Sequence, residues 1–69
     1  MTNYRIKERA VNLGMSLREL SGYVADKLPQ YRVTLPALSA AINCRGAMTE
    51  RDRRMCEAAD SILREKEKG

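Results

Sequence analysis

The sequence predicts an all-α fold, a compact bundle of four or five short helices, on three observations. Apolar residues recur at spacings of three and four in four separate segments, which is the period of an amphipathic helix. The chain is rich in Ala and aliphatic residues, and it contains three Tyr but no Phe or Trp. At 43% hydrophobic and 32% charged residues, its composition is that of a globular protein. Residues 1–69 are enough for one domain and are predicted to form one.

A first helix is predicted over residues 3–13. Ile6, Ala10 and Leu13 recur at helical spacing and give this segment an apolar stripe. Gly14 follows directly, at the position where a left-handed residue commonly ends a helix. The pattern therefore supplies both the buried face and the end of the helix.

The second helix, predicted over residues 17–27, has the clearest start signal in the chain. The run from Ser16 to Glu19 reads SLRE, a capping box in which the Ser16 hydroxyl accepts from the Glu19 amide. Pro29 ends the helix because it disfavours helical geometry at the residue before it. Gly22 costs about 1 kcal/mol relative to Ala, and we expect another helix to cross closely there. The apolar seam consists of Leu17, Leu20, Val24 and Leu28.

A third helix is predicted over residues 35–43, with Thr34 as its N-cap residue. Pro36 falls in the first turn, where the missing amide does no harm. The apolar back of this helix is formed by Leu35, Leu38 and Ile42. The opposite face carries mostly short side chains, those of Pro36, Ala37, Ala40 and Asn43. A helix with this low front is suited to close approach to another surface.

A fourth helix is predicted to begin after Thr49, its N-cap residue. Asp52, three residues later, stands where a capping box has its acidic residue. Its inward positions are Met55, Cys56, Ala59, Ile62 and Leu63. Two i,i+4 ion pairs, each worth a few tenths of a kcal/mol, are predicted on its outer side: Glu50 with Arg54 and Asp60 with Arg64. Residues 64–69 alternate in charge and are predicted to form a frayed tail.

The formal net charge is +4, and its distribution matters more than its size. Residues 27–49 contain Lys27, Arg32 and Arg45 and no acidic residue, so the basic zone surrounds the third helix. A basic zone attracts phosphate without regard to sequence, although three charges alone also fit a solvated face. A second basic cluster, Arg51, Arg53 and Arg54, is interleaved with Glu50 and Asp52 and is predicted to be a solvated face.

Several functional classes are disfavoured by the composition. The chain has no His and no Gly-rich phosphate loop, so we expect no enzyme, no cofactor and no small-molecule ligand. Cys44 and Cys56 are too few for a structural zinc site and are predicted to be reduced packing residues, with no metal. No apolar stretch is long enough to span a membrane and no signal-peptide pattern is present, which favours a cytoplasmic protein.

Two stretches carry a resemblance to a known family. An amphipathic helix from Ile6 leads through Gly14 into a Ser-capped second helix, and residues 37–43 followed by Gly46 have the pattern of a recognition helix and its exit loop. From about Ile6 to Leu63 the chain resembles the phage-repressor or Cro-type (lambda-repressor-like) helix-turn-helix DNA-binding domains.

The connector between the second and third helices departs from that family. The family usually has a tight turn containing Gly, whereas residues 28–33 form a longer link with Pro29 and no Gly. Tyr31 and Val33 would suit a brief extended stretch, although a lone strand has nothing to pair with. Tyr23 and Tyr31 are the largest side chains near the connector and are predicted to fill the core with the hydroxyl at the surface.

The resemblance implies a sequence-specific, double-stranded DNA-binding transcriptional regulator similar to small phage or mobile-element repressors. The third helix would enter the major groove, and a homodimer would contact two half-sites. The residues expected to face bases are Thr34, Pro36, Ala37, Ser39 and Ala40. Those expected to contact phosphates at the rim are Arg18, Arg32, Asn43 and Arg45. The alternative is an antitoxin-like or adaptor module that uses the same helix to bind a protein, in which case Ala40 and Ala41 would pack on a neighbouring helix or subunit.

Overall fold

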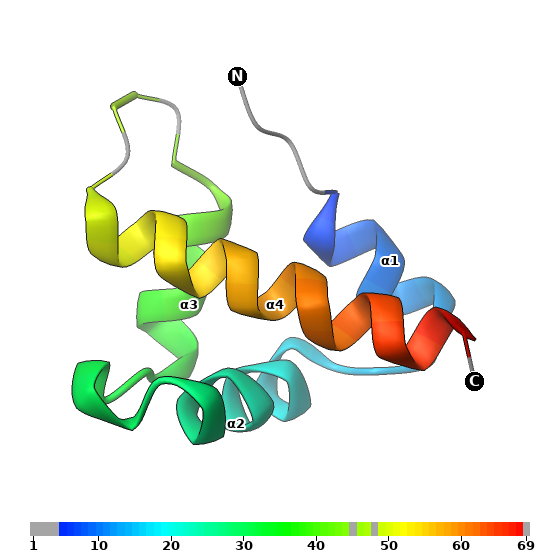
Figure 1. Ribbon diagram of the computed structural model, residues 1–69. Coiled ribbons are helices and arrows are strands. Elements are labelled where there is room, and N and C mark those ends of the chain that lie inside the picture. The colour runs from blue at the N-terminus through cyan, green and yellow to red at the C-terminus, as the bar shows by residue number, and fades with distance from the viewer. Residues whose placement is uncertain (1–4, 45, 48, 69) are drawn as a thin grey trace.

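The computed structural model describes residues 5–44, 46–47 and 49–68, and every regular element in them is helical. The predicted all-α class is therefore confirmed, with four α-helices and one 3-10 turn (Figure 1). In chain order the elements are α1 (Ile6–Asn12), α2 (Leu17–Lys27), η1 (Pro29–Tyr31), α3 (Leu35–Ile42) and α4 (Glu50–Lys68).

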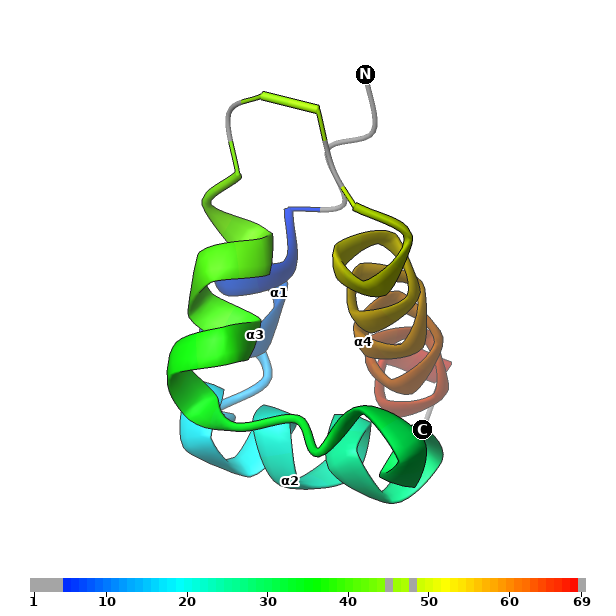
Figure 2. The same ribbon diagram turned by 90° about the vertical axis from the view of Figure 1, so that its left-hand side faces the viewer.

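The longest helix, α4, organises the domain because it packs against α1, α2 and α3. Helix α2 also contacts α1 and α3, so it closes the bundle on a second side. Figure 2 shows α3 and α4 flanking the core, with α2 running across one end of both. Helices α2 and α3, which are consecutive in the chain, are therefore also neighbours in space.

Each α-helix contributes buried apolar residues to a single core, but Leu13, predicted to lie on the stripe of the first helix, follows the end of α1 and is exposed. The side chains that are fully buried or nearly so include Leu20, Val24, Leu38, Met55 and Leu63. The inward positions predicted for the fourth helix are all buried, which confirms its period. Ala41 of α3 is only 1% exposed and belongs to the core, although the sequence pattern did not place it on the apolar face of this helix.

Helix α1 is shorter than predicted at its N-terminal end. Arg5 adopts a left-handed conformation with φ of 53°, so the helix begins at Ile6; residues 3 and 4 of the predicted helix lie outside the described part of the chain. At the other end Gly14 is left-handed with φ of 71°, as predicted. The Met15 amide donates to the Ala10 carbonyl at 2.8 Å, which with the Gly14 amide bond to Val11 completes a Schellman motif.

The three predicted N-caps are present. The Ser16 hydroxyl accepts from the Glu19 amide at 3.1 Å, and the Thr49 hydroxyl accepts from the Asp52 amide at the same distance. Thr34 caps α3 with a 3.3 Å bond from the amide three residues later. Because the caps fix where helices start, the boundaries of α2 match the prediction and α3 differs from it only in ending at Ile42.

Two expectations about α2 are wrong. Gly22 is exposed, and a Cβ atom placed on it would meet no other atom within 4 Å, so no helix crosses there. Tyr23 is 41% exposed rather than buried, and the Lys66 ammonium lies 5.1 Å from the centre of its ring. Tyr31, in contrast, is half-buried and packs against the core as predicted.

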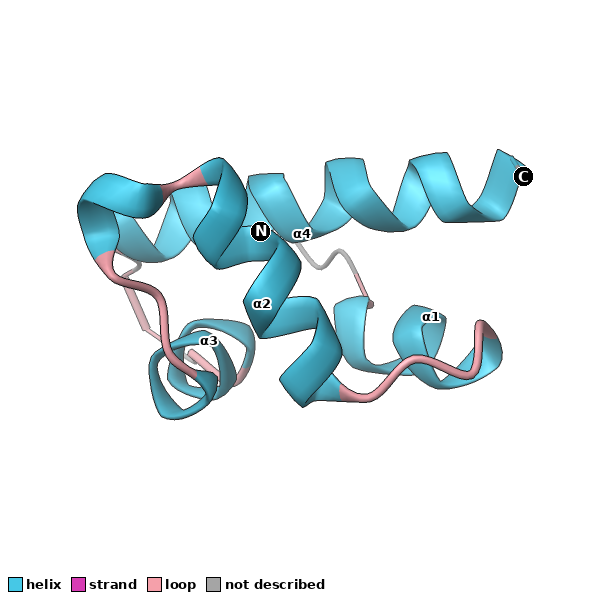
Figure 3. Ribbon diagram, turned by 90° about the horizontal axis from the view of Figure 1, so that it is seen from below, coloured by secondary structure: helices cyan, strands magenta, loops and turns pink. Residues whose placement is uncertain are grey.

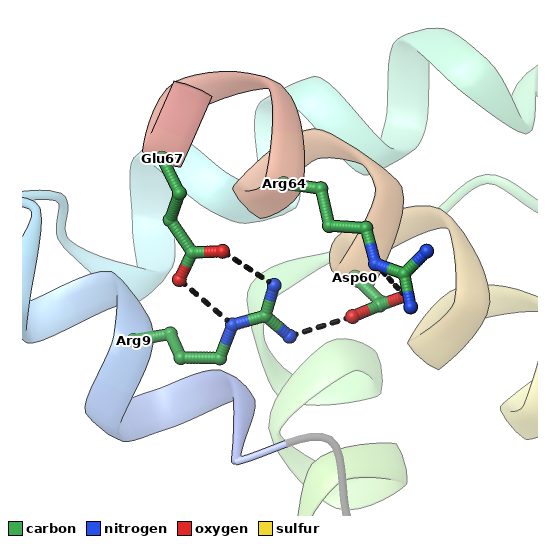
Figure 4. A network of polar contacts seen from close by, with 4 residues as sticks. All are labelled: Arg9, Asp60, Arg64 and Glu67. Carbon is green, nitrogen blue, oxygen red and sulfur yellow. Dashed lines mark hydrogen bonds and ion pairs between the residues drawn. The ribbon is translucent and has the colours of Figure 1, made fainter. Parts of the chain in front are cut away.

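The C-terminal segment, predicted to form a frayed tail, is helical to Lys68 and contacts α1 through an ion-pair network. Helix α4 continues to Lys68, leaving only residue 69 outside the described part. Arg9 of α1 donates to both carboxylate oxygens of Glu67, at 2.9 and 3.0 Å, and to Asp60 at 2.6 Å (Figure 4). Arg64 also contacts Asp60, so this network ties α1 to the C-terminal half of α4.

Candidate nucleic-acid interface

The outer face of α3 carries short, exposed side chains. Pro36, Ala40 and Asn43 are exposed, while Leu38 and Ala41 on the opposite side are buried. Thr34, at the start of the helix, is exposed as well. The helix therefore presents a low surface to solvent and keeps its apolar side in the core.

The other two residues expected to face bases are less accessible. Ala37 is half-buried and packs against the core, because it lies at the flank of α3 rather than at its front. Ser39 is also half-buried, and Asn43 donates its side-chain amide to the Ser39 carbonyl at 3.0 Å and to the hydroxyl at 3.4 Å. Asn43 thus closes the last turn of α3, and donation to a phosphate would require it to exchange one of these bonds.

The link between α2 and α3 is a 3-10 turn followed by a left-handed residue, not an extended stretch (Figure 3). The turn ends at Arg32, whose φ of 50° and ψ of 54° are left-handed and whose amide donates to the Pro29 carbonyl at 3.3 Å. An L-residue in this conformation costs about 1–2 kcal/mol, and Gly is the residue that normally occupies it. A strained, exposed cation therefore lies two residues before Thr34, the cap of α3.

Ion pairs are distributed unevenly over the described residues. Every ion pair there joins side chains of α1, of α4, or of Arg5 just before α1. Arg18, Lys27 and Arg32 are exposed, and none of them forms an ion pair with another described residue. Exposed Glu19 and Asp26 lie on the same helix as Arg18 and Lys27, so α2 is balanced in charge and Arg32 of the turn adds the net positive charge on this side. Arg45, the remaining predicted phosphate contact, lies outside the described residues.

Sequence reasoning missed the position of Arg51. The guanidinium of this α4 residue reaches the α2–α3 turn, where Nη2 donates to the Tyr31 carbonyl at 2.9 Å. Arg51, Arg53 and Arg54 are all exposed, which agrees with the predicted solvated face. Glu50 contacts Arg54 at 3.5 Å, the i,i+4 pair that the sequence predicted. The sequence did not indicate the bond from Arg51 to the turn.

The exposed side of α2 has a different character. Glu19, Gly22, Tyr23 and Asp26 line a shallow hollow of about 320 Å³. Its two carboxylates disfavour phosphate, so this hollow does not extend the basic surface. Arg18 lies on the same helix but outside the hollow's lining.

The two cysteines are free, as predicted, but differ in their surroundings. Cys56 is buried, its thiol lies 3.8 Å from the Ala41 carbonyl, and desolvation raises its pKa to about 11. Cys44 is half-buried beside the exit loop of α3. Among the residues that the structure describes, no group of three or more His, Cys, Asp or Glu side chains is placed to hold a metal ion.

Within the described part of the chain, no helix combines the length and the apolar character needed to cross a membrane. Comparisons of the chain with protein-family models, curated proteins and solved structures found no match.

Proposed function

We propose that this domain is a sequence-specific, double-stranded DNA-binding transcriptional regulator, a small repressor of the phage or mobile-element type. The observation that supports this most is the exposed front of α3 next to cations without ion-pair partners among the described residues. Helix α3 would enter the major groove, and Arg18 and Arg32 would contact the phosphates at its rim. The resemblance of the sequence to Cro-type domains gives the same assignment.

The short side chains on the front of α3 let the helix fit into the major groove, but they offer few hydrogen bonds for recognising individual bases. Pro36 and Ala40 can make apolar contact with thymine methyl groups, and the Thr34 hydroxyl can still donate while it accepts from the backbone. No Arg, Gln or Asn stands in the first turn to form a bidentate bond with a purine. We therefore propose that two domains bind together as a homodimer, so that paired half-sites supply the specificity that one helix lacks.

A protein-interaction module, antitoxin-like or adaptor, is the second candidate. The observation that favours it is the hollow on α2, where an exposed Tyr23 lies between two carboxylates. Such a surface suits a basic protein segment better than a nucleic acid. This function would leave the exposed Arg32 at the turn without a role.

A charge placed on the front of α3 tests the proposal. In Ala40→Glu the new carboxylate would face the major groove, whereas in Val11→Glu the same charge would lie on α1, where the side chain is 68% exposed. Binding is measured by fluorescence anisotropy with duplexes selected from a random pool. We expect Ala40→Glu to abolish binding and Val11→Glu to retain it, with both variants helical by circular dichroism.

Two results would contradict the proposal. If Ala40→Glu binds DNA as tightly as the unmodified protein, α3 does not enter the major groove. Loss of helicity in Ala40→Glu would show that this face packs inside the protein, against the exposure described above.

A further inference from the structure

We propose that Arg51 is a DNA-backbone contact, through which the first turn of α4 extends the interface at the α2–α3 turn. This inference rests on the proposed function and adds a third element to it. It starts from one hydrogen bond, the 2.9 Å contact from Arg51 Nη2 to the Tyr31 carbonyl. That carbonyl belongs to the peptide unit that joins Tyr31 to Arg32, so the Arg51 guanidinium contacts the backbone beside a second exposed arginine.

The bond to Tyr31 leaves most of the guanidinium available. Arginine has five N–H donors, and the Tyr31 bond uses one of them. Arg51 is exposed, so the remaining donors face solvent rather than the core. A guanidinium held at one nitrogen has lost part of its rotational freedom before a ligand arrives, which lowers the entropic cost of binding.

No described carboxylate competes for this group. Glu50, the preceding residue, bonds to Arg54 at 3.5 Å, and the half-buried Asp52 forms no ion pair with another described residue. The positions that face Arg51 along α4 are three and four residues away, and in the described helix these are Arg54 and Met55. Among the described residues Arg51 therefore forms no ion pair, although the Glu50–Arg54 pair lies in the same turn of α4.

A backbone phosphate is the ligand that matches this arrangement. Its non-bridging oxygens accept parallel N–H bonds from a guanidinium, and its charge is opposite to that of the two arginines. In the proposed complex the backbone strand that borders the major groove passes the start of α3, which Thr34 caps and Arg32 precedes by three residues. Arg51 would donate hydrogen bonds to a phosphate of that strand from α4 while it keeps its bond to the Tyr31 carbonyl of the turn.

The test uses three variants of the full chain, Arg51→Gln, Arg51→Lys and Arg53→Gln. Arg53 is the matched control: it is exposed and lies two residues along α4, about 200° around the helix axis. Gln is a good helix former, but its amide ends two bonds short of the Nη2 position, so Arg51→Gln removes both the charge and the bond to the Tyr31 carbonyl. The thermal unfolding curve reports what the loss of that bond costs the fold. Affinity for a random-sequence duplex is measured by anisotropy from 50 to 200 mM salt, with thermal unfolding alongside.

We expect Arg51→Gln to reduce the slope of log affinity against log salt by about 0.9, the value for one phosphate contact. Its affinity at low salt should fall about tenfold, as for loss of a charge-assisted bond. Arg51→Lys should keep the slope because it keeps the charge, and Arg53→Gln should keep both slope and affinity.

Other outcomes overturn the inference in distinguishable ways. If the unmodified protein binds with a steep salt dependence and Arg51→Gln keeps the same slope, Arg51 makes no phosphate contact although the domain binds DNA. If Arg51→Gln and Arg51→Lys lose affinity equally with the slope unchanged, Arg51 only positions the turn. If the unmodified protein shows no salt-dependent affinity at all, the proposed function itself fails.

Discussion

Two glycines with equally open surroundings should respond to alanine in opposite directions. Gly22 lies in the middle of α2 and is exposed, whereas Gly14 ends α1 with φ of 71°. A Cβ atom at either position would meet no other atom within 4 Å. An added methyl group therefore causes no steric clash at either glycine, and the two substitutions differ only in the backbone conformation that alanine must adopt.

The magnitudes follow from the backbone terms. At Gly22, alanine should stabilise the domain by about 1 kcal/mol, through helix propensity and the reduced entropy of the unfolded chain. At Gly14, the left-handed conformation costs alanine about 1–2 kcal/mol, and the unfolded-state gain offsets part of this, which leaves a loss of about 1 kcal/mol. For 69 residues the unfolding entropy is about 0.14 kcal/mol per kelvin, so each change shifts Tm by about 7 °C.

Thermal unfolding followed by circular dichroism at 222 nm measures both shifts. We expect Gly22→Ala to raise Tm and Gly14→Ala to lower it, so that the two variants differ by about 14 °C. A lower Tm for Gly22→Ala would refute the reasoning, because some part of the protein or of a second copy would then have to occupy the space beside α2. A Gly14→Ala variant as stable as the unmodified protein would refute the left-handed end of α1.

Three further predictions test other parts of the structure. The Arg9 hydrogen bond and charge hold the pKa of Glu67 below its ordinary value of 4.5, so the pair stabilises the fold fully above that pH and the contribution is lost as pH falls through the lowered pKa. Tm measured from pH 7 to pH 2.5 should therefore fall more for the unmodified protein than for Glu67→Gln, and equal falls would contradict the pair. Arg32→Gly should keep or raise Tm, because it relieves the left-handed strain, yet weaken DNA binding; unchanged binding would show that the strained cation has no role at the interface. A thiol reagent at pH 7.5 should modify half-buried Cys44 while buried Cys56, with its pKa raised to about 11, reacts only after denaturation, and rapid labelling of both would contradict the burial of Cys56.

Local signals allowed most of the fold to be predicted from the sequence. Capping residues and apolar spacing set the start of α2 at Leu17 and the inward face of α4, because both signals act within one helical turn. The same signals failed at the C-terminal end. Residues 64–68 have little apolar character, and they are held in a helix by the contact of Glu67 with Arg9, 58 residues away in sequence.

The candidate site was predictable in part. The short front of α3 follows from its period, and the exposure of Pro36 and Ala40 agrees with it. The left-handed Arg32 was not predictable, because a non-Gly residue in that conformation gives no local signal. Arg51 was missed for a related reason: its bond to the turn joins elements 20 residues apart.

The salt dependence of binding to random-sequence duplex DNA tests the central claim most directly. With Arg18, Arg32, Arg51 and Arg45 on phosphates, four charge contacts should give a slope of about −3.6 in log affinity against log salt. We predict measurable binding at 50 mM salt that weakens along this slope. An absence of binding at 50 mM salt, or an affinity that does not change with salt, would contradict the account.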